Sequence, residues 1–208
     1  DMSIEAALPI ARIEAELGVA ASYFVLLRGE TYNPWTAAAC AGLRQLLDLG
    51  HDIGLHLDAS LYPGQAEALD RAAEEECRVL ETITGAAIET VSFHRPAEAL
   101  LGRDGKVAGR RHTYLPRYFN EMGYCSDSRG EWRHGHPFDH PALAEGRALQ
   151  LLTHPIWWSR DAAADPVTVL DRFRIERDGA LAAALSANCI PYREARGDRP
   201  GPITRNDE

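Results

Sequence analysis

The sequence predicts an α/β fold in which parallel strands are joined by helices, as in an α/β barrel or an open α/β sheet. Helical patterns and strand-like runs alternate three times along the first half of the chain, mostly with short connections. An apolar run follows each helical pattern, at residues 21–27, 52–58 and 88–94. This alternation favours crossover helices between parallel strands over a helical bundle or a β-sandwich.

Prolines mark the expected starts of the three helices, because proline suits the first turn of a helix. Pro9 precedes apolar residues that recur at spacings of three and four. Asn33 and Pro34 indicate an N-cap and a first helical residue, with the helix running to about residue 49. Pro63 begins an alanine- and glutamate-rich pattern that runs to about residue 82 and stops near Gly85.

In the second half of the chain the alternation of helical patterns and strand-like runs is less regular. Residues 97–149 are rich in glycine, arginine, aromatic residues and histidine, and within them only residues 123–127 resemble a strand. Residues 148–154 predict a further strand, and Asp165 is expected to cap a helix that runs to about residue 187. The loop-rich part is the kind of segment that builds a functional site.

The composition limits the possible partners. Of the 208 residues, 31 are acidic and 22 are lysine or arginine, which gives a formal net charge of −9 and argues against binding to nucleic acid. No run approaches the roughly 20 apolar residues of a membrane span, and no signal peptide is apparent, so we expect a soluble protein that is cytoplasmic by default. The four cysteines lie far apart, which favours reduced thiols over a zinc knuckle or a disulfide framework.

Titratable side chains recur where the strand-like runs end. His56 and Asp58 share one face of their predicted strand, because side chains alternate along a strand. His94, Asp127 and His154 stand at the ends of three other runs. Catalytic groups collect at the carboxyl ends of parallel strands, so these residues are expected to form one site.

Two neighbouring features each allow two interpretations. The segment 134–140, HGHPFDH, is either a metal-binding cluster or a solvated substrate loop. Trp157 and Trp158 are either core or rim aromatics or a surface that stacks on sugar rings or other apolar ligand faces.

The order of these segments resembles the polysaccharide deacetylase family, the NodB-homology domains of carbohydrate esterase family four. Residues 50–56, GHDIGLH, are similar to the family's GHEIGNH segment, whose last histidine binds a metal ion. Residues 21–24, ASYF, are similar to the family's ATFF strand. The resemblance covers roughly residues 1–158 and implies a deformed (β/α) barrel that lacks its first strand in this chain.

The resemblance also implies roles for individual residues. Asp1 falls where the family's first motif ends, so it resembles the metal-binding aspartate, and the usual aspartate base would precede it. Arg95 resembles the arginine of the arginine-and-proline motif and would orient a carboxylate base. Asp127 falls near the motif that frames the substrate pocket. His154 resembles the histidine of the final motif, which serves as the general acid.

One departure from the family pattern concerns the metal ligands. The family's second metal-binding histidine lies four residues after the first, and Ser60 stands at that position after His56. His94 is the first choice as the replacement ligand, because a neutral imidazole on a neighbouring strand could complete a zinc site. Asp58 is the second choice, and it is otherwise expected to contact substrate.

The sequence therefore predicts a metal-dependent hydrolase that removes an N-acetyl group from a sugar or glycan and uses a divalent ion, expected to be zinc. The catalytic domain is expected to occupy residues 1–195 and to be followed by a flexible tail at residues 196–208. The alternative is a carbohydrate-binding or scaffold domain that kept the fold but lost catalysis, which is suggested by Ser60 and by the absence of the usual aspartate base from the given sequence. A third possibility is a hydrolase of another small acyl or C–N substrate, because a fold does not determine its substrate.

Overall fold

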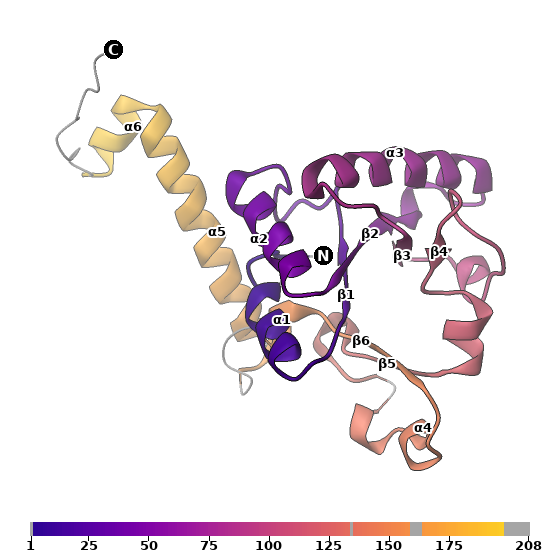
Figure 1. The fold of residues 1–208 in the computed structure, drawn as a ribbon. Helices are drawn as coiled ribbons and strands as arrows, with labels where there is room; N and C mark the ends of the chain where they lie inside the picture. The colour runs from indigo at the N-terminus through magenta and orange to yellow at the C-terminus, as the bar shows by residue number, and fades with distance from the viewer. Residues whose placement is uncertain (1, 134, 159–163, 198–208) are drawn as a thin grey trace. The chain divides into compact units, whose positions relative to one another are not determined.

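The structure is a computed structural model that describes residues 2–133, 135–158 and 164–197 (Figure 1). The chain forms two compact units, Asp1–Ala162 and Ala163–Glu208. The strands of the described residues all lie in the first unit, and the second unit contains helices. The predicted single domain over residues 1–195 stays a prediction, and most of the predicted tail lies outside the described residues.

Four parallel strands form the main sheet of the first unit, in the order β1-β2-β3-β4. Their bounds are β1 Ser22–Val25, β2 Asp52–Asp58, β3 Thr90–His94 and β4 Arg111–His112. Each of the three runs predicted in this half contains a strand, and β2 has the predicted bounds. The parallel α/β class is thus confirmed, with strands that follow each other in sequence lying side by side.

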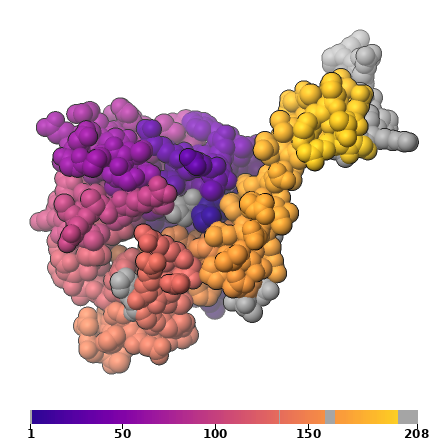
Figure 2. Space-filling view, turned by 180° about the vertical axis from the view of Figure 1, so that it is seen from behind, coloured from indigo at the N-terminus to yellow at the C-terminus, as the bar shows by residue number. Residues whose placement is uncertain are grey.

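A second sheet contains the parallel strands β5 and β6. β5 spans Gly123–Ser126 and β6 spans Leu149–Leu152, so both lie within the predicted runs. The described strands pair in two separate sheets, and the closed barrel expected from the family resemblance stays a prediction. Short 3-10 turns, α4 (Pro141–Ala144) and a π-helical turn at Arg117–Glu121 occupy the intervening chain. Figure 2 shows this part of the chain, coloured pink to salmon, as a large share of the surface on that side of the first unit.

The helices α1 (Ala7–Glu16), α2 (Ala37–Asp48) and α3 (Ala66–Thr84) pack with the main sheet. α2 and α3 both contact β2 and each other, and α1 contacts α2. Leu55 and Leu57 of β2 are buried in one core cluster with Leu43 of α2 and Leu80 of α3. Side chains alternate along β2, so the burial of Leu55 and Leu57 in the core places His56 and Asp58 on the opposite face of the strand.

The helix after β1 begins later than Pro34 predicts. Asn33 Oδ1 accepts a hydrogen bond from the Trp35 backbone N–H at 2.9 Å, which closes a local turn. Thr36 is extended, and its hydroxyl oxygen accepts from the Ala39 backbone N–H at 3.2 Å. Thr36 is therefore the N-cap of α2, because it satisfies an N–H of the first turn that has no partner within the helix.

The start of α3 also differs from the prediction, whereas its end agrees. Gly64 has a φ of +68°, so it turns the chain after Pro63, and α3 begins only at Ala66. At the other end Gly85 is left-handed and donates its backbone N–H to the Glu81 carbonyl at 2.8 Å. Glycine adopts this conformation without a Cβ clash, which explains why the predicted stop is correct.

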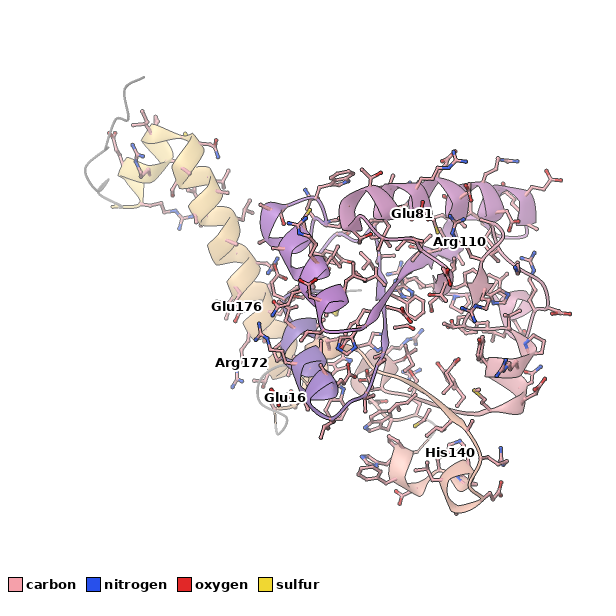
Figure 3. The ribbon with its side chains drawn as sticks, in the orientation of Figure 1. Glu16, Glu81, Arg110, His140, Arg172 and Glu176 are labelled. Atoms are coloured by element: carbon pink, nitrogen blue, oxygen red, sulfur yellow. The ribbon has the colours of Figure 1, made fainter. Side chains whose placement is uncertain are left out.

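Arg110 links the loop before β4 to α3. Its guanidinium donates to Glu74 at 2.6 Å and to Glu81 at 3.2 Å, and its Nε donates to the Ile88 carbonyl at 2.7 Å. Figure 3 shows Glu81 on α3 and Arg110 next to it, just below the helix. These contacts join the helix to the loops at the β3 and β4 starts, away from the ends that carry His56 and His94.

The second unit contains α5 (Pro166–Asn188) and α6 (Ile190–Ala195), which contact each other. Asp165 caps α5, as predicted, by accepting from the backbone N–H groups of Val167 and Thr168. Within the described part of the chain, no helix combines the length and the apolar character that crossing a membrane requires.

Candidate functional site

β2 and β3 bring His56 and His94 together on one face of the main sheet. His56 lies opposite Ser92 and Asp58 lies opposite His94, so the two histidines are diagonal neighbours across the strand pair. His56 Nε2 lies 3.2 Å from His94 Nδ1. The two rings meet edge to face, with their centroids 5.1 Å apart.

The surroundings of these two histidines disfavour their charged forms. Desolvation lowers the pKa of His56 well below its ordinary value, and the charges of His94 and His154 act in the same direction. Desolvation also lowers the pKa of His94, with the positive charge of Arg95 adding to the effect and Asp58 opposing it. Both imidazoles are therefore neutral at pH 7, and each has one ring nitrogen with a lone pair.

β5 and β6 bring Asp127 and His154 together in a second pair. Ser126 lies opposite Leu152, so the residues that follow these two strands are also adjacent. His154 Nδ1 donates to Asp127 Oδ1 at 2.7 Å, and the His154 backbone N–H donates to both carboxylate oxygens at 3.0 Å. Because the carboxylate only accepts, the proton between the two groups is on Nδ1, which leaves Nε2 as the nitrogen that can bind or release a second proton.

The two pairs lie at the ends of strands in two separate sheets. A positive charge on His154 would disfavour the charged forms of both His56 and His94, because it adds to the desolvation that lowers their pKa values. Asp127 is only 3% exposed, and its hydrogen bonds offset the free-energy cost of burying a carboxylate. The structure thus joins the side chains of four strand ends as two pairs, His56 with His94 and Asp127 with His154, and a single site made of all four stays a prediction.

Two further predicted residues flank this site. Arg95 directly follows His94 with a φ of +51°, which is uncommon for a residue with a Cβ atom and turns the chain sharply at the end of β3. Asp58 Oδ1 accepts from the Ser60 backbone N–H at 3.1 Å and from its hydroxyl at 2.6 Å. One Asp58 oxygen therefore caps the turn Ala59–Leu61.

The adjacent tryptophans differ in their surroundings. Trp158 Nε1 donates to Asp127 Oδ2 at 2.7 Å, and its side chain is partly exposed. Trp157 Nε1 is buried and has no hydrogen-bond partner among the residues the structure describes. Trp132 packs its ring 5.9 Å from that of Trp158, a contact that sequence reasoning missed because no local pattern connects the two positions.

Two histidines of the segment 134–140, His136 and His140, form local hydrogen bonds that account for their positions without a metal ion. His136 Nδ1 accepts from the Phe138 backbone N–H at 3.3 Å, and His140 Nδ1 accepts from the Ala142 backbone N–H at 3.1 Å. Both nitrogens thus cap short helical turns, and Figure 3 shows His140 in this region near α4. His134 lies outside the described residues.

The proposed metal ligands lie partly outside the described chain. Asp1 is not among the described residues. Across residues 2–133, 135–158 and 164–197, no three or more His, Cys, Asp or Glu side chains are grouped so that they could hold a metal ion.

Comparisons with known proteins find similar solved structures but no match to a protein family or to a curated protein. No protein-family model and no curated protein matches the chain. The wild-type form of a CE4-family pseudoenzyme from Bacillus anthracis is similar at a TM-score of 0.41 and 13% identity, over 85% of this chain and 57% of that one. A mutant of this pseudoenzyme, described as having restored enzymatic activity, gives a TM-score of 0.40 and 13% identity over 85% and 59%. The chain thus spans less than two thirds of the length of these structures.

Proposed function

We propose that this chain is a metal-dependent hydrolase that removes an N-acetyl group from a sugar or glycan, as a divergent polysaccharide deacetylase with a barrel of the NodB type. The observation that carries the proposal is the His56–His94 pair, whose ring nitrogens lie 3.2 Å apart at the ends of neighbouring parallel strands. The hydrogen-bonded Asp127–His154 pair at the ends of the second sheet supports it. Metal-dependent hydrolysis of an amide uses ligands that hold the metal ion and an acid that protonates the leaving nitrogen, and the two pairs would supply these groups.

The nitrogen pair is suited to a zinc ion. Two nitrogens at about 2.0–2.1 Å from a tetrahedral zinc are roughly 3.3 Å apart, and His56 Nε2 and His94 Nδ1 are 3.2 Å apart. The lowered pKa values keep both rings neutral, which is the state that binds metal. His56 and His94 would hold the ion, with Asp1 as the proposed further ligand. When bound, such an ion polarises the amide carbonyl and lowers the pKa of water.

Asp127 and His154 supply the proton chemistry of the proposal. Asp127 holds the imidazole in the tautomer with the proton on Nδ1, so Nε2 faces the reaction as the nitrogen that gains and loses a proton. A protonated Nε2 gives its proton to the departing sugar nitrogen, and the buried carboxylate stabilises the imidazolium. The products are acetate and a free amine.

Arg95, Asp58 and the tryptophans complete the proposed site. Arg95 would orient a carboxylate base, and Asp58 would contact the substrate through the oxygen that does not cap the turn at Ala59–Leu61. Trp157 and Trp158 are the proposed contacts with sugar rings. Of the two, only Trp158 presents a large exposed area, so it is the stronger candidate for this contact.

The test measures metal content and acetate release on the same purified protein. After zinc supplementation and removal of free metal, elemental analysis is expected to show stoichiometric zinc. A panel of N-acetylated mono- and oligosaccharides is then screened for acetate, and the active substrate is expected to yield equal amounts of acetate and free amine. Zinc binding without acetate from any substrate would contradict the hydrolase.

A catalytically inactive carbohydrate-binding domain is the second candidate. Ser60 donates its hydroxyl to Asp58 where a second metal-binding histidine is expected, and the described residues contain no group of three potential ligands. This candidate predicts saturable binding of glycans, no stoichiometric zinc and no acetate. The zinc measurement therefore separates the two candidates before the substrate is known.

A further inference from the structure

Asp127 accepts hydrogen bonds from two residues that lie four positions apart in the chain. His154 donates to it through Nδ1 and through its backbone N–H, and Trp158 donates through Nε1. The 2.7 Å bond from Trp158 reaches Oδ2, whereas the 2.7 Å bond from His154 Nδ1 reaches Oδ1. The two aromatic side chains thus hold opposite oxygens of one buried carboxylate.

The local chain path explains why Trp158 reaches this carboxylate. Pro155–Trp157 form a 3-10 turn, in which Trp157 donates its backbone N–H to the His154 carbonyl and Trp158 donates to the Pro155 carbonyl, both at 3.0 Å. The turn returns the chain so that His154 and Trp158 approach Asp127 together. Trp132 packs against the Trp158 indole at a tilted angle of 52°, which restrains the ring from another side.

We propose that Trp158 is a positioning residue for the Asp127–His154 pair, because its indole N–H prevents the carboxylate from rotating away from His154 Nδ1. The effect of Trp158 on catalysis rests on the proposed function, because Trp158 would act through His154 and does not itself contact the reacting atoms. The hydrogen bond by which the indole holds the carboxylate does not depend on that function.

The chemistry of a buried carboxylate supports this role. A hydrogen bond to a charged group is stronger than one between neutral groups, and it has a preferred direction. With Trp158 Nε1 removed, Oδ2 keeps, among the residues that the structure describes, the bond from the His154 backbone N–H, which is shared with Oδ1. The carboxylate then loses the bond that opposes rotation, and the tautomer and direction of the imidazole become less well defined.

Trp158→Phe separates positioning from stacking on the substrate. Phenylalanine keeps an aromatic ring for contact with a sugar and with Trp132, but it has no N–H. Positioning predicts that kcat falls by about 10- to 100-fold, the range for losing a hydrogen bond to a charged group, while KM stays unchanged. A pure stacking role predicts the opposite pattern, in which kcat is kept and KM rises modestly.

A spectroscopic measurement tests the inference without any activity. In ¹⁵N–¹H spectra of the full chain, the Trp158 indole proton and the His154 Nδ1 proton are expected to be shifted downfield and protected from exchange. Trp158→Phe should broaden or remove the His154 Nδ1 signal, and Asp127→Asn should move the Trp158 indole signal toward that of an exposed tryptophan. Trp157→Phe is the matched control, because the Trp157 indole nitrogen has no partner among the described residues.

The outcomes are distinguishable. If the His154 Nδ1 signal is the same in wild type and Trp158→Phe, the positioning role is overturned, whatever the activity. If neither protein releases acetate but the signal is lost in Trp158→Phe, the proposed hydrolase fails and the positioning of His154 is upheld. If Trp158→Phe does not fold, the Trp158 indole signal of Asp127→Asn is measured instead. An indole signal that is the same in this variant and in wild type overturns the positioning role.

Discussion

His56 Nε2 and His94 Nδ1 lie 3.2 Å apart across the β2–β3 strand pair. Two neutral imidazoles at this distance either share one proton in a hydrogen bond or direct two lone pairs toward one cation. The parallel register determines the arrangement, because it places His56 beside Ser92 and His94 beside Asp58 on a single face. A site of this kind is held by strands, which are more rigid supports than loops.

Removing either histidine of the pair is expected to abolish zinc uptake. His56→Ala and His94→Ala each leave a single imidazole, and one nitrogen donor cannot hold the ion against competition from water. Elemental analysis after dialysis against trace zinc measures the loss. His136→Ala is the control, because its Nδ1 caps a loop turn, and zinc loss in this variant would move the metal site to the 134–140 segment.

Asp127→Asn is expected to reduce kcat by about 10²- to 10⁴-fold with zinc content unchanged. The amide has one acceptor oxygen where the carboxylate has two, so it cannot accept from both the His154 ring and the Trp158 indole in the present geometry. Steady-state kinetics and elemental analysis of the same sample measure the two effects. Wild-type activity in the Asp127→Asn variant would exclude the pair from the chemistry.

The stability of the fold is expected to fall in mild acid, with His112 contributing to the loss. Desolvation, aided by the charge of Arg103, lowers the pKa of this buried imidazole in the folded protein. The unfolded chain therefore binds the proton more readily, so stability is full above the unfolded pKa of about 6.5 and is lost as the pH falls toward the folded pKa.

His112→Leu tests this dependence, because leucine fills the space beside Phe93 without a titratable group. Its Tm is expected to fall less than that of wild type between about pH 7.5 and 5, the window around the unfolded pKa. His56 and His94 have lowered pKa values of the same sign, so part of the loss remains in the variant. An equal loss of Tm in both proteins would exclude His112 as a contributor.

Gly54→Ala is expected to destabilise the first unit by about 1–3 kcal/mol, the range for overpacking a filled site. A Cβ atom at this position would lie 2.5 Å from Phe24 Cε1 and 2.7 Å from Thr90 Oγ1, between β1 and β3. Denaturant unfolding measures the change. Gly179→Ala in α5 is the control, because its Cβ meets no atom within 4 Å and alanine favours a helix.

Local sequence patterns predicted the presence and type of the helices and strands better than the residues at which the helices begin. The bounds of β2 follow from the alternation of buried and polar residues, and the end of α3 follows from a glycine in the left-handed region. The starts of α2 and α3 were placed too early, because Pro34 and Pro63 belong to turns that precede each helix. A proline permits a first helical turn but does not require one, and Thr36 competes as the cap.

The sequence by itself determined which side chains stand at strand ends, since that depends on periodicity and on the lengths of apolar runs. Only the tertiary structure decided how those side chains combine. The pairing of His56 with His94 depends on the register of β2 and β3, and the pairing of Asp127 with His154 depends on that of β5 and β6. The bond from Trp158 to Asp127 depends on the direction of a single turn. Register and turn direction arise from packing between distant segments, so a local pattern cannot contain them.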